Sequence, residues 1–256
     1  MDVIAEITQR RIQPALKNLY AGVMLILAID TALAACAAAV LDTSAGIIAQ
    51  ESQAMKRGHA EALMPLIARV MKASGVAFAA LDRIAATTGP GSFTGLRVGL
   101  SAARGIALAA GKPVVGVTTL TAFAAPIVSE NDEPHPVLAA IDARHDQVYF
   151  QVVGRDGNSL IKPKVAPIAE ALDAARFGAL HLVGNAARIL ADRWPADAAP
   201  PFKVDQRAAP DIAWVAWLGA AVSPESSPAR PYYLRAPDAK PSKDLLAGAA
   251  QPPASR

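Results

Sequence analysis

Apolar runs in the first third of the chain predict three short β-strands joined by tight turns. The expected strands span residues 24–31, 35–41 and 47–53. A turn signal, Asp42-Thr43-Ser44-Ala45-Gly46, separates the second strand from the third. Consecutive strands with such short connections are typical of an antiparallel meander, because a short loop can only reverse the direction of the chain.

Helical periodicity follows over residues 59–73, where apolar side chains recur at i, i+3 and i+4 spacing. That face carries Leu63, Leu66, Ile67, Val70 and Met71. A strand over residues 82–88 then leads into a helix over Phe93–Ala110, with Ser92 as its N-cap. A short strand over residues 114–117 and a helix over 119–128 complete this unit.

The second half of the chain repeats this organisation. A buried-strand pattern over residues 137–141 ends in Asp142, as the first strand of the chain ends in Asp30-Thr31. The other expected elements here are strands at 147–153, 159–164 and 180–183 and helices at 167–175, 184–192 and 210–221. Duplicated units of this kind predict an α/β fold of the actin-like ATPase type, with two lobes built on duplicated mixed sheets.

Four segments are expected from these patterns. Residues 24–130 form the N-terminal lobe, which also carries the partner interface, and residues 131–235 form the C-terminal lobe. A polar stretch with Pro134 and Pro136 is expected to be the linker between them. Residues 1–23 are expected to be an appendage, and residues 236–256, rich in Pro, Ala, Ser and Lys, a flexible tail.

Composition narrows the class of protein only slightly. Hydrophobic residues make up 53% of the 256 residues, which excludes global disorder. The net charge is +3 without a run of Lys and Arg, so composition alone does not argue for nucleic-acid binding. Cys36 is the single cysteine, and the chain therefore has no internal disulfide. A reducing cytoplasm is the expected location.

A secretion signal is the alternative that the first forty residues raise. Arg10 and Arg11 precede an apolar stretch in which Leu33-Ala34-Ala35-Cys36 resembles a lipoprotein cleavage box. Asp30 lies inside that stretch, and a carboxylate at the centre of a bilayer costs about 2.5–3.5 kcal/mol. We therefore favour two strands here and expect no membrane association.

The segment Gly89-Pro90-Gly91-Ser92 and the helix after it are the most specific part of the sequence. The loop suits either a phosphate site at a helix start or a plain strand-to-helix turn, and the turn is favoured for the loop alone. Gly95, Gly99 and Ala103 recur at i+4 in the helix, where each glycine costs about 1 kcal/mol relative to alanine. Another part of the chain or a partner helix is therefore expected to approach this stripe closely.

Several motifs in collinear order resemble the TsaB (YeaZ) family. They are Leu27-Ala28-Ile29-Asp30-Thr31, His59-Ala60-Glu61, the run from Gly89 to Arg97, Asp142-Ala143-Arg144 with Val148-Tyr149, and Pro231-Tyr232-Tyr233-Leu234-Arg235. The resemblance implies a non-catalytic subunit of the complex that makes N6-threonylcarbamoyladenosine in tRNA. It further implies pairing with the catalytic subunit TsaD and the ATPase TsaE, contact with tRNA through the complex, and a cytoplasmic location, and it allows a homodimer in isolation. The sequence leaves open the preference between homodimer and heterodimer and whether the chain touches tRNA directly.

Departures from the catalytic sister subunit favour a chain without its own activity. That subunit carries an H-x-x-x-H metal pair after this helix, whereas Thr119 and Phe123 stand at the corresponding positions here. Nucleotide-binding members of the superfamily place glycine after the strand-ending Asp, whereas this chain has Ala32 and Arg144 there. We therefore expect no catalytic residue, no metal ligand and no cofactor, and the sequence leaves open whether Asp30 or Asp142 contacts a nucleotide.

Two alternative functions and one expected surface remain. An active nucleotide-dependent kinase or metallopeptidase-like enzyme would use Asp30 and Asp142 as Mg-nucleotide carboxylates, although a carboxylate that caps a turn is favoured for both. A lipid-anchored envelope protein rests on Cys36 alone. The partner interface is expected on the two helices that begin at residues 59 and 93, at His59, Leu63, Ile67, Ser92, Phe93, Gly95, Leu96, Gly99 and Ala103.

Overall fold

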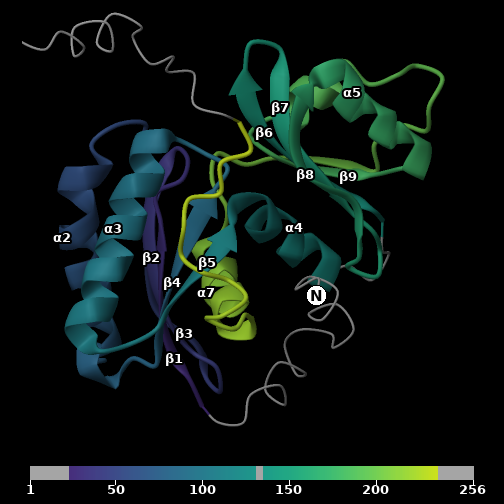
Figure 1. Cartoon of the computed structure of the whole chain (residues 1–256). Coiled ribbons are helices and arrows are strands. Elements are labelled where there is room, and N and C mark those ends of the chain that lie inside the picture. Colours follow the sequence, from purple (N-terminus) through teal and green to yellow (C-terminus); the bar gives the residue numbers. More distant parts are fainter. Residues whose placement is uncertain (1–22, 131–134, 236–256) are drawn as a thin grey trace, which may run out of the picture.

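The computed structural model describes residues 23–130 and 135–235. The expected appendage up to residue 22, the centre of the expected linker and the expected tail from residue 236 lie outside the described residues. Within the described part, two five-stranded sheets stand in two lobes (Figure 1).

The first sheet has the strand order β3-β2-β1-β4-β5. β1, β2 and β3 are antiparallel neighbours, whereas β4 and β5 run parallel to β1. This confirms the expected meander. Because both faces of the sheet are covered, β1 and β2 are continuous apolar runs rather than alternating ones. The strands are β1 (Leu25–Asp30), β2 (Ala35–Asp42), β3 (Gly46–Ala54), β4 (Arg83–Gly89) and β5 (Val114–Thr118).

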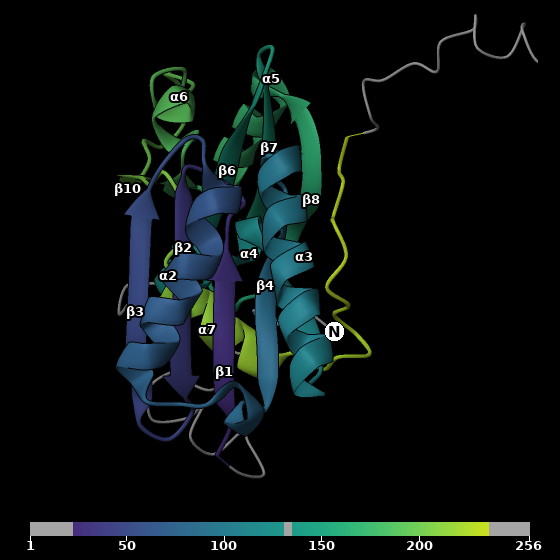
Figure 2. The ribbon, with the colours of Figure 1, turned by 90° about the vertical axis from the view of Figure 1, so that its left-hand side faces the viewer.

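Helices cover both faces of the first sheet. α2 (His59–Ser74) and α3 (Phe93–Ala110) lie side by side on one face, and α7 (Ile212–Ala221) covers the other (Figures 1 and 2). Gly75 and Gly111 end α2 and α3 in the left-handed conformation, which a residue without Cβ adopts at little cost. A single 3-10 turn, η2 (Phe78–Ala80), leads from α2 into β4.

The second sheet, taken in the order β8-β7-β6-β9-β10, repeats the order and the directions of the first. Three antiparallel strands are again followed by two parallel ones, which confirms the predicted duplicated, actin-like α/β fold. The elements are β6 (Val137–Arg144), β7 (Gln147–Val153), β8 (Ser159–Pro167), α5 (Ile168–Leu172), η3 (Asp173–Phe177), β9 (His181–Gly184), α6 (Ala187–Ala191) and β10 (Lys203–Gln206).

Helix α4 (Thr119–Glu130) joins the two lobes (Figure 1). Its Leu120, Phe123 and Ala124 share one apolar cluster with β6 and β9 of the second sheet. The chain also returns to the first lobe after the second sheet, because α7 packs on the first sheet through Trp214 and its apolar neighbours. This last helix therefore belongs structurally with the first lobe, although it was expected in the second.

Two local features differ from the sequence-based expectation. The helix expected from residue 184 begins at Ala187, because Gly184 ends β9 with φ +112° and a Cβ there would lie 2.2 Å from the Ala140 carbonyl oxygen. β10 was not expected, since Lys203-Val204-Asp205-Gln206 is a short, polar edge strand without an apolar run.

Candidate partner surface and interlobe cleft

The turn between β1 and β2 lies directly against the start of α3. The Thr31 hydroxyl donates a buried hydrogen bond to the Gly95 carbonyl oxygen at 2.7 Å. A Cβ built on Gly95 would lie 2.1 Å from the Thr31 carbonyl oxygen, and one on Gly99 would lie 2.4 Å from the Thr31 hydroxyl. Both glycines are therefore required by close packing within this chain.

The loop before α3 is a strand-to-helix turn held by the same β1–β2 turn. The Ser92 backbone N–H donates to the Ala32 carbonyl oxygen at 2.7 Å, and a Cβ on Gly91 would lie 2.3 Å from that oxygen. The Ser92 hydroxyl accepts from the Gly95 N–H at 3.3 Å, which confirms Ser92 as the N-cap of α3. The approach of Ala32 accounts for Gly91 without a phosphate.

Six of the nine residues expected at a partner interface are buried inside this chain. They are Leu63, Ile67, Gly95, Leu96, Gly99 and Ala103. They fill the space between α2, α3 and the first sheet. Their side chains therefore contact this chain rather than the partner that the sequence predicted. The other three, His59, Ser92 and Phe93, are partly or largely exposed and line a cleft between the lobes.

α2 and α3 lie side by side over the first sheet (Figure 2). Exposed apolar and small residues lie on their outer faces. The exposed fraction is 50% for Met64 and 86% for Leu108. Gly105 is exposed near the middle of α3, and a Cβ built there meets nothing within 4 Å. Since a mid-helix glycine costs about 1 kcal/mol relative to alanine, Gly105 has no explanation within the described part of the chain. A surface that approaches α3 from outside would explain it.

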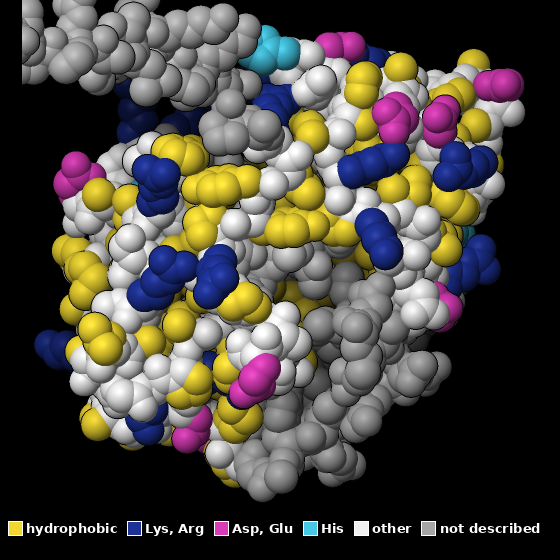
Figure 3. Space-filling model, viewed as in Figure 1, with side chains coloured by type: hydrophobic (Ala, Val, Ile, Leu, Met, Phe, Trp, Pro, Cys, Tyr) yellow, Lys and Arg dark blue, Asp and Glu magenta, His cyan; other side chains and the backbone are white. Residues whose placement is uncertain are grey.

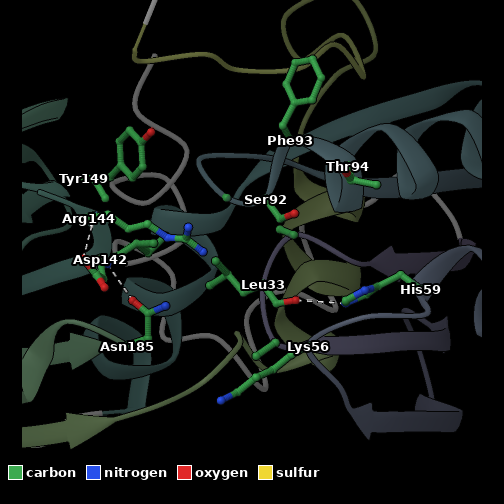
Figure 4. A pocket seen from close by; sticks show the side chains of 15 residues that line it. Leu33, Lys56, His59, Ser92, Phe93, Thr94, Asp142, Arg144, Tyr149 and Asn185 are labelled. Carbon is green, nitrogen blue, oxygen red and sulfur yellow. Dashed lines mark hydrogen bonds between the residues drawn. The ribbon is translucent and has the colours of Figure 1, made fainter. Parts of the chain in front are cut away.

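The interlobe cleft has a volume of about 760 Å³ and receives side chains from both lobes (Figure 4). Lys56, His59 and the start of α3 come from the first lobe, whereas Asp142, Arg144, Tyr149 and Asn185 come from the second. His59 Nε2 lies 3.1 Å from the Leu33 carbonyl oxygen, which holds the imidazole at the cleft wall. Among the described lining residues Asp142 is the one carboxylate, so the cleft is net basic.

A strained turn presents Arg144 to the cleft. Arg144, His145 and Asp146 have φ values of +61°, +52° and +58°, a region that L-residues other than glycine rarely occupy. The Asp142 carboxylate accepts from the Arg144 N–H at 2.7 Å, the Asp146 carbonyl accepts from the Ile168 N–H at 3.0 Å, and Arg193 pairs with Asp146. Several contacts thus fix one conformation, in which the Arg144 side chain extends toward Ser92 (Figure 4).

Asp30 and Asp142 have different environments. Asp30 is fully buried, and its Oδ1 accepts from the Thr87 hydroxyl at 2.6 Å and from the Ala32 N–H at 3.0 Å. Burial raises the pKa of the Asp30 carboxyl above 3.8, while these two hydrogen bonds and His59 lower it. Asp142 is exposed in the cleft, and its N–H donates to Asn185 Oδ1 at 2.8 Å. Each carboxylate thus caps a turn, as favoured from the sequence.

The positions that correspond to the metal pair of the catalytic sister subunit lie in the core. Thr119 and Phe123 are buried at the start of α4, and Phe123 packs in the apolar cluster between the lobes. In the described part of the chain, no group of three His, Cys, Asp or Glu side chains is arranged to hold a metal ion.

A C-terminal strap, residues 227–235, crosses from the first lobe to the second (Figure 1). Arg104 Nε donates to the Ala229 carbonyl oxygen at 3.0 Å, and the Tyr232 N–H donates to the Thr88 carbonyl oxygen at 2.8 Å. At its end Arg235 donates to the Ala143 carbonyl oxygen at 3.1 Å. The sequence predicted no structural role for this segment. Two adjacent tyrosines in a polar stretch, Tyr232 and Tyr233, are the signal that could have indicated one.

The position of Cys36 in this fold is incompatible with a lipoprotein cleavage site. It is buried in β2, opposite Gln53 of β3. Cleavage before Cys36 would remove β1, which is the middle strand of the first sheet. Burial raises the pKa of the Cys36 thiol to about 11. Across the described segments, no helix combines the length and the apolarity needed to cross a membrane.

Comparison with known proteins relates the chain to proteins of tRNA modification. A family model described as "TsaD: tRNA N6-adenosine threonylcarbamoyltransferase" matches residues 44–196, more than half of the chain. The chain is 38% identical over 137 residues to the tRNA threonylcarbamoyladenosine biosynthesis protein TsaB of Escherichia coli, covering 54% of this chain and 58% of that protein. It therefore spans little more than half the length of this curated relative.

Other relatives align over nearly their full length. An uncharacterized protein of Mycobacterium tuberculosis is 33% identical over 219 residues, which are 84% of this chain and 94% of that protein. The solved structure of YeaZ from Pseudomonas aeruginosa is 27% identical with a TM-score of 0.67, covering 82% of this chain and all of that one. Together with the ordered motifs and the duplicated fold, these matches establish that the chain belongs to the TsaB (YeaZ) family.

Proposed function

We propose that this chain is the non-catalytic partner subunit of a complex that synthesises N6-threonylcarbamoyladenosine in tRNA. In this proposal it pairs with a TsaD-type catalytic subunit and works with a TsaE-type ATPase, and a second copy of the chain takes the partner's place in isolation. Family membership supports the pathway, because the E. coli relative is named for threonylcarbamoyladenosine biosynthesis. The pairing itself is argued from the surface of the first lobe.

The outer face of α2 and α3 carries the proposal of a partner subunit. Met64 and Leu108 expose apolar area there, and Gly105 leaves a smooth position between flanking side chains. A related subunit presents the same two helices, so two such faces can pack as four helices with Gly105 at a close crossing. A standard specific interface buries about 800 Å² on each partner, which two helices of this length can supply.

The absence of catalysis is supported by what occupies the positions that chemistry would need. Phe123 cannot ligate a metal and Thr119 is buried beside it, so the metal pair of the catalytic sister has no counterpart at these positions. Ala32 and Arg144 stand where nucleotide-binding relatives of the superfamily carry glycine. No observation specifically favours the alternative of an active kinase or metallopeptidase-like enzyme.

Reconstitution tests this proposal. The full chain, a TsaD-type subunit and a TsaE-type ATPase from the same organism are mixed with tRNA and the activated threonylcarbamoyl donor. We expect modification of the tRNA adenosine only when the TsaD-type subunit is present, and more of it when this chain is added. Transfer by this chain alone, or transfer by the other components that is unaffected by this chain, would contradict the proposal.

A further inference from the structure

The C-terminal strap and the start of α3 build an exposed stack of aromatic and guanidinium planes beside the interlobe cleft. The Arg97 guanidinium lies 3.8 Å from the centre of the Phe93 ring, and the Tyr233 ring stacks on Phe93 with a centroid distance of 5.8 Å and an interplanar angle of 30°. Tyr233 ends this stack and is 49% exposed. Because about half of Tyr233 is exposed, a further planar group can extend the stack there.

The stack is held in place before any ligand arrives. Hydrogen bonds from Arg104 to Ala229 and from Tyr232 to Thr88 fix the strap to the first lobe, and Arg235 fixes its end to the second. The Arg235 guanidinium also lies over the ring of Tyr149, which lines the cleft, at 5.8 Å. Little ordering of these side chains would be needed on binding, which favours affinity.

Positive charge surrounds the stack and continues into the cleft. Lys56 and Arg144 line the cleft, Phe93 lies at its edge, and none of Lys56, Arg97 and Arg144 forms an ion pair with another described residue. Figure 3 shows basic side chains beside hydrophobic ones on this face, with the Asp and Glu side chains mostly toward its margins. Cations without an ion-pair partner beside a half-exposed aromatic ring suit a ligand that offers both phosphates and flat rings.

From this arrangement we propose that the strap and the cleft mouth bind single-stranded RNA. One unpaired base stacks on Tyr233, and the neighbouring phosphates lie against Arg97, Arg144 and Lys56. Single strands are the fitting class because their bases are free to leave the strand and stack on aromatic side chains, whereas a duplex keeps them paired. The proposal deepens the proposed function, on which its biological meaning rests: the subunit would contact the tRNA directly.

The test measures binding of a labelled, unstructured, single-stranded RNA to the full chain by fluorescence anisotropy. Tyr233→Leu keeps an apolar contact with Phe93 but removes the ring, whereas Tyr233→Phe keeps the ring. A stacked base contributes about 1–3 kcal/mol, so Tyr233→Leu should weaken binding about 5- to 150-fold and Tyr233→Phe should bind like the wild type. Phe202→Ala removes another exposed, stacked aromatic, on His135 of the second lobe, and should leave binding unchanged.

Salt dependence gives an independent measurement. Arg144→Gln should reduce the slope of log affinity against log salt by about 0.7, the value for one phosphate of a single strand. Circular dichroism checks the fold of each variant, and Arg144→Gln carries the test alone if Tyr233→Leu does not fold. Because the isolated chain is used, failure here is distinguishable from failure of partner pairing.

Four results would overturn the proposal. They are wild-type RNA affinity of folded Tyr233→Leu, an equal loss in Phe202→Ala, equal competition by a duplex of the same length, and an unchanged salt slope in Arg144→Gln. A Tyr233→Leu variant that keeps RNA affinity but binds the TsaD-type subunit more weakly would reassign the surface to a protein partner.

Discussion

The Thr31 hydroxyl is bonded to the carbonyl oxygen of Gly95, so the β1–β2 turn and the first turns of α3 form one packed unit. The backbone of α3 can come this close only because residues 95 and 99 have no Cβ. The glycines that mark the family motif therefore position the helix within the subunit. The outer face of the same helix remains free for another subunit.

A matched pair of glycine substitutions on α3 tests this division. Gly99→Ala places a Cβ 2.4 Å from the Thr31 hydroxyl, and overpacking of this kind typically lowers the free energy of unfolding by about 1–3 kcal/mol. Gly105→Ala meets nothing and should raise it by about 0.5–1 kcal/mol, the helix propensity difference between glycine and alanine. Urea unfolding followed by circular dichroism measures both.

A substitution of Thr31, combined with Gly99→Ala, serves as the control for this pair. Thr31→Ala removes the hydroxyl that Gly99→Ala would strike, so the double variant should be less destabilised than the sum of the two single ones. Additive effects, or a Gly105→Ala variant as unstable as Gly99→Ala, would mean that the two glycines do not differ as described.

The buried carboxyl of Asp30 predicts a pH dependence of stability. Because burial raises its pKa in the folded state, the native protein binds this proton more tightly than the unfolded chain does. The contribution of Asp30 to the free energy of unfolding is therefore most favourable below pH 3.8. It is lost as the pH rises through the raised pKa. Relative to the wild type, Asp30→Asn should gain stability as the pH rises over this range. Urea unfolding at several pH values checks it, and a flat or falling difference speaks against a raised pKa.

The buried thiol of Cys36 predicts slow chemical labelling. Its pKa is raised to about 11, and the thiolate is the form that attacks thiol reagents, so almost none of the native protein is reactive at neutral pH. We expect a thiol-specific dye to label native protein only at the rate at which it unfolds, and to label urea-unfolded protein at once. Rapid labelling without denaturant would place Cys36 outside the core.

Much of the fold was predictable, because both faces of each sheet are covered and the apolar runs are strong. The bounds of α3 and β7 agree with the pattern, and Ser92 caps α3 as its position before the helix indicated. The duplication of the α/β unit followed from the repeat of a strand ending in Asp, at Asp30 and Asp142. β10 was not predicted, because a short edge strand needs few apolar residues. α7 was expected in the second lobe, because sequence order does not reveal that the chain returns to the first sheet.

The candidate surfaces were less predictable than the fold. A glycine stripe indicates close approach but not the approaching group. Only the folded structure shows that Gly95 and Gly99 pack against Thr31 and that Gly105 is exposed. The stack of Arg97, Phe93 and Tyr233 joins residues more than a hundred positions apart, which no local pattern reports. The sequence therefore assigned the strap to the family motifs but gave it no structural role, which its contacts with both lobes supply.

We propose that the outer face of α2 and α3 pairs with a TsaD-type subunit, and the affinity of that pair measures this directly. Leu108→Asp charges the most exposed apolar residue of this face, while Leu160→Asp makes the same change at an exposed leucine of β8 in the second lobe. By isothermal titration calorimetry, Leu108→Asp should weaken binding by about tenfold or more, as for an interface residue that contributes over 1 kcal/mol, and Leu160→Asp should bind like the wild type. Full affinity of a folded Leu108→Asp variant, or an equal loss in both variants, would show that the partner does not bind this face.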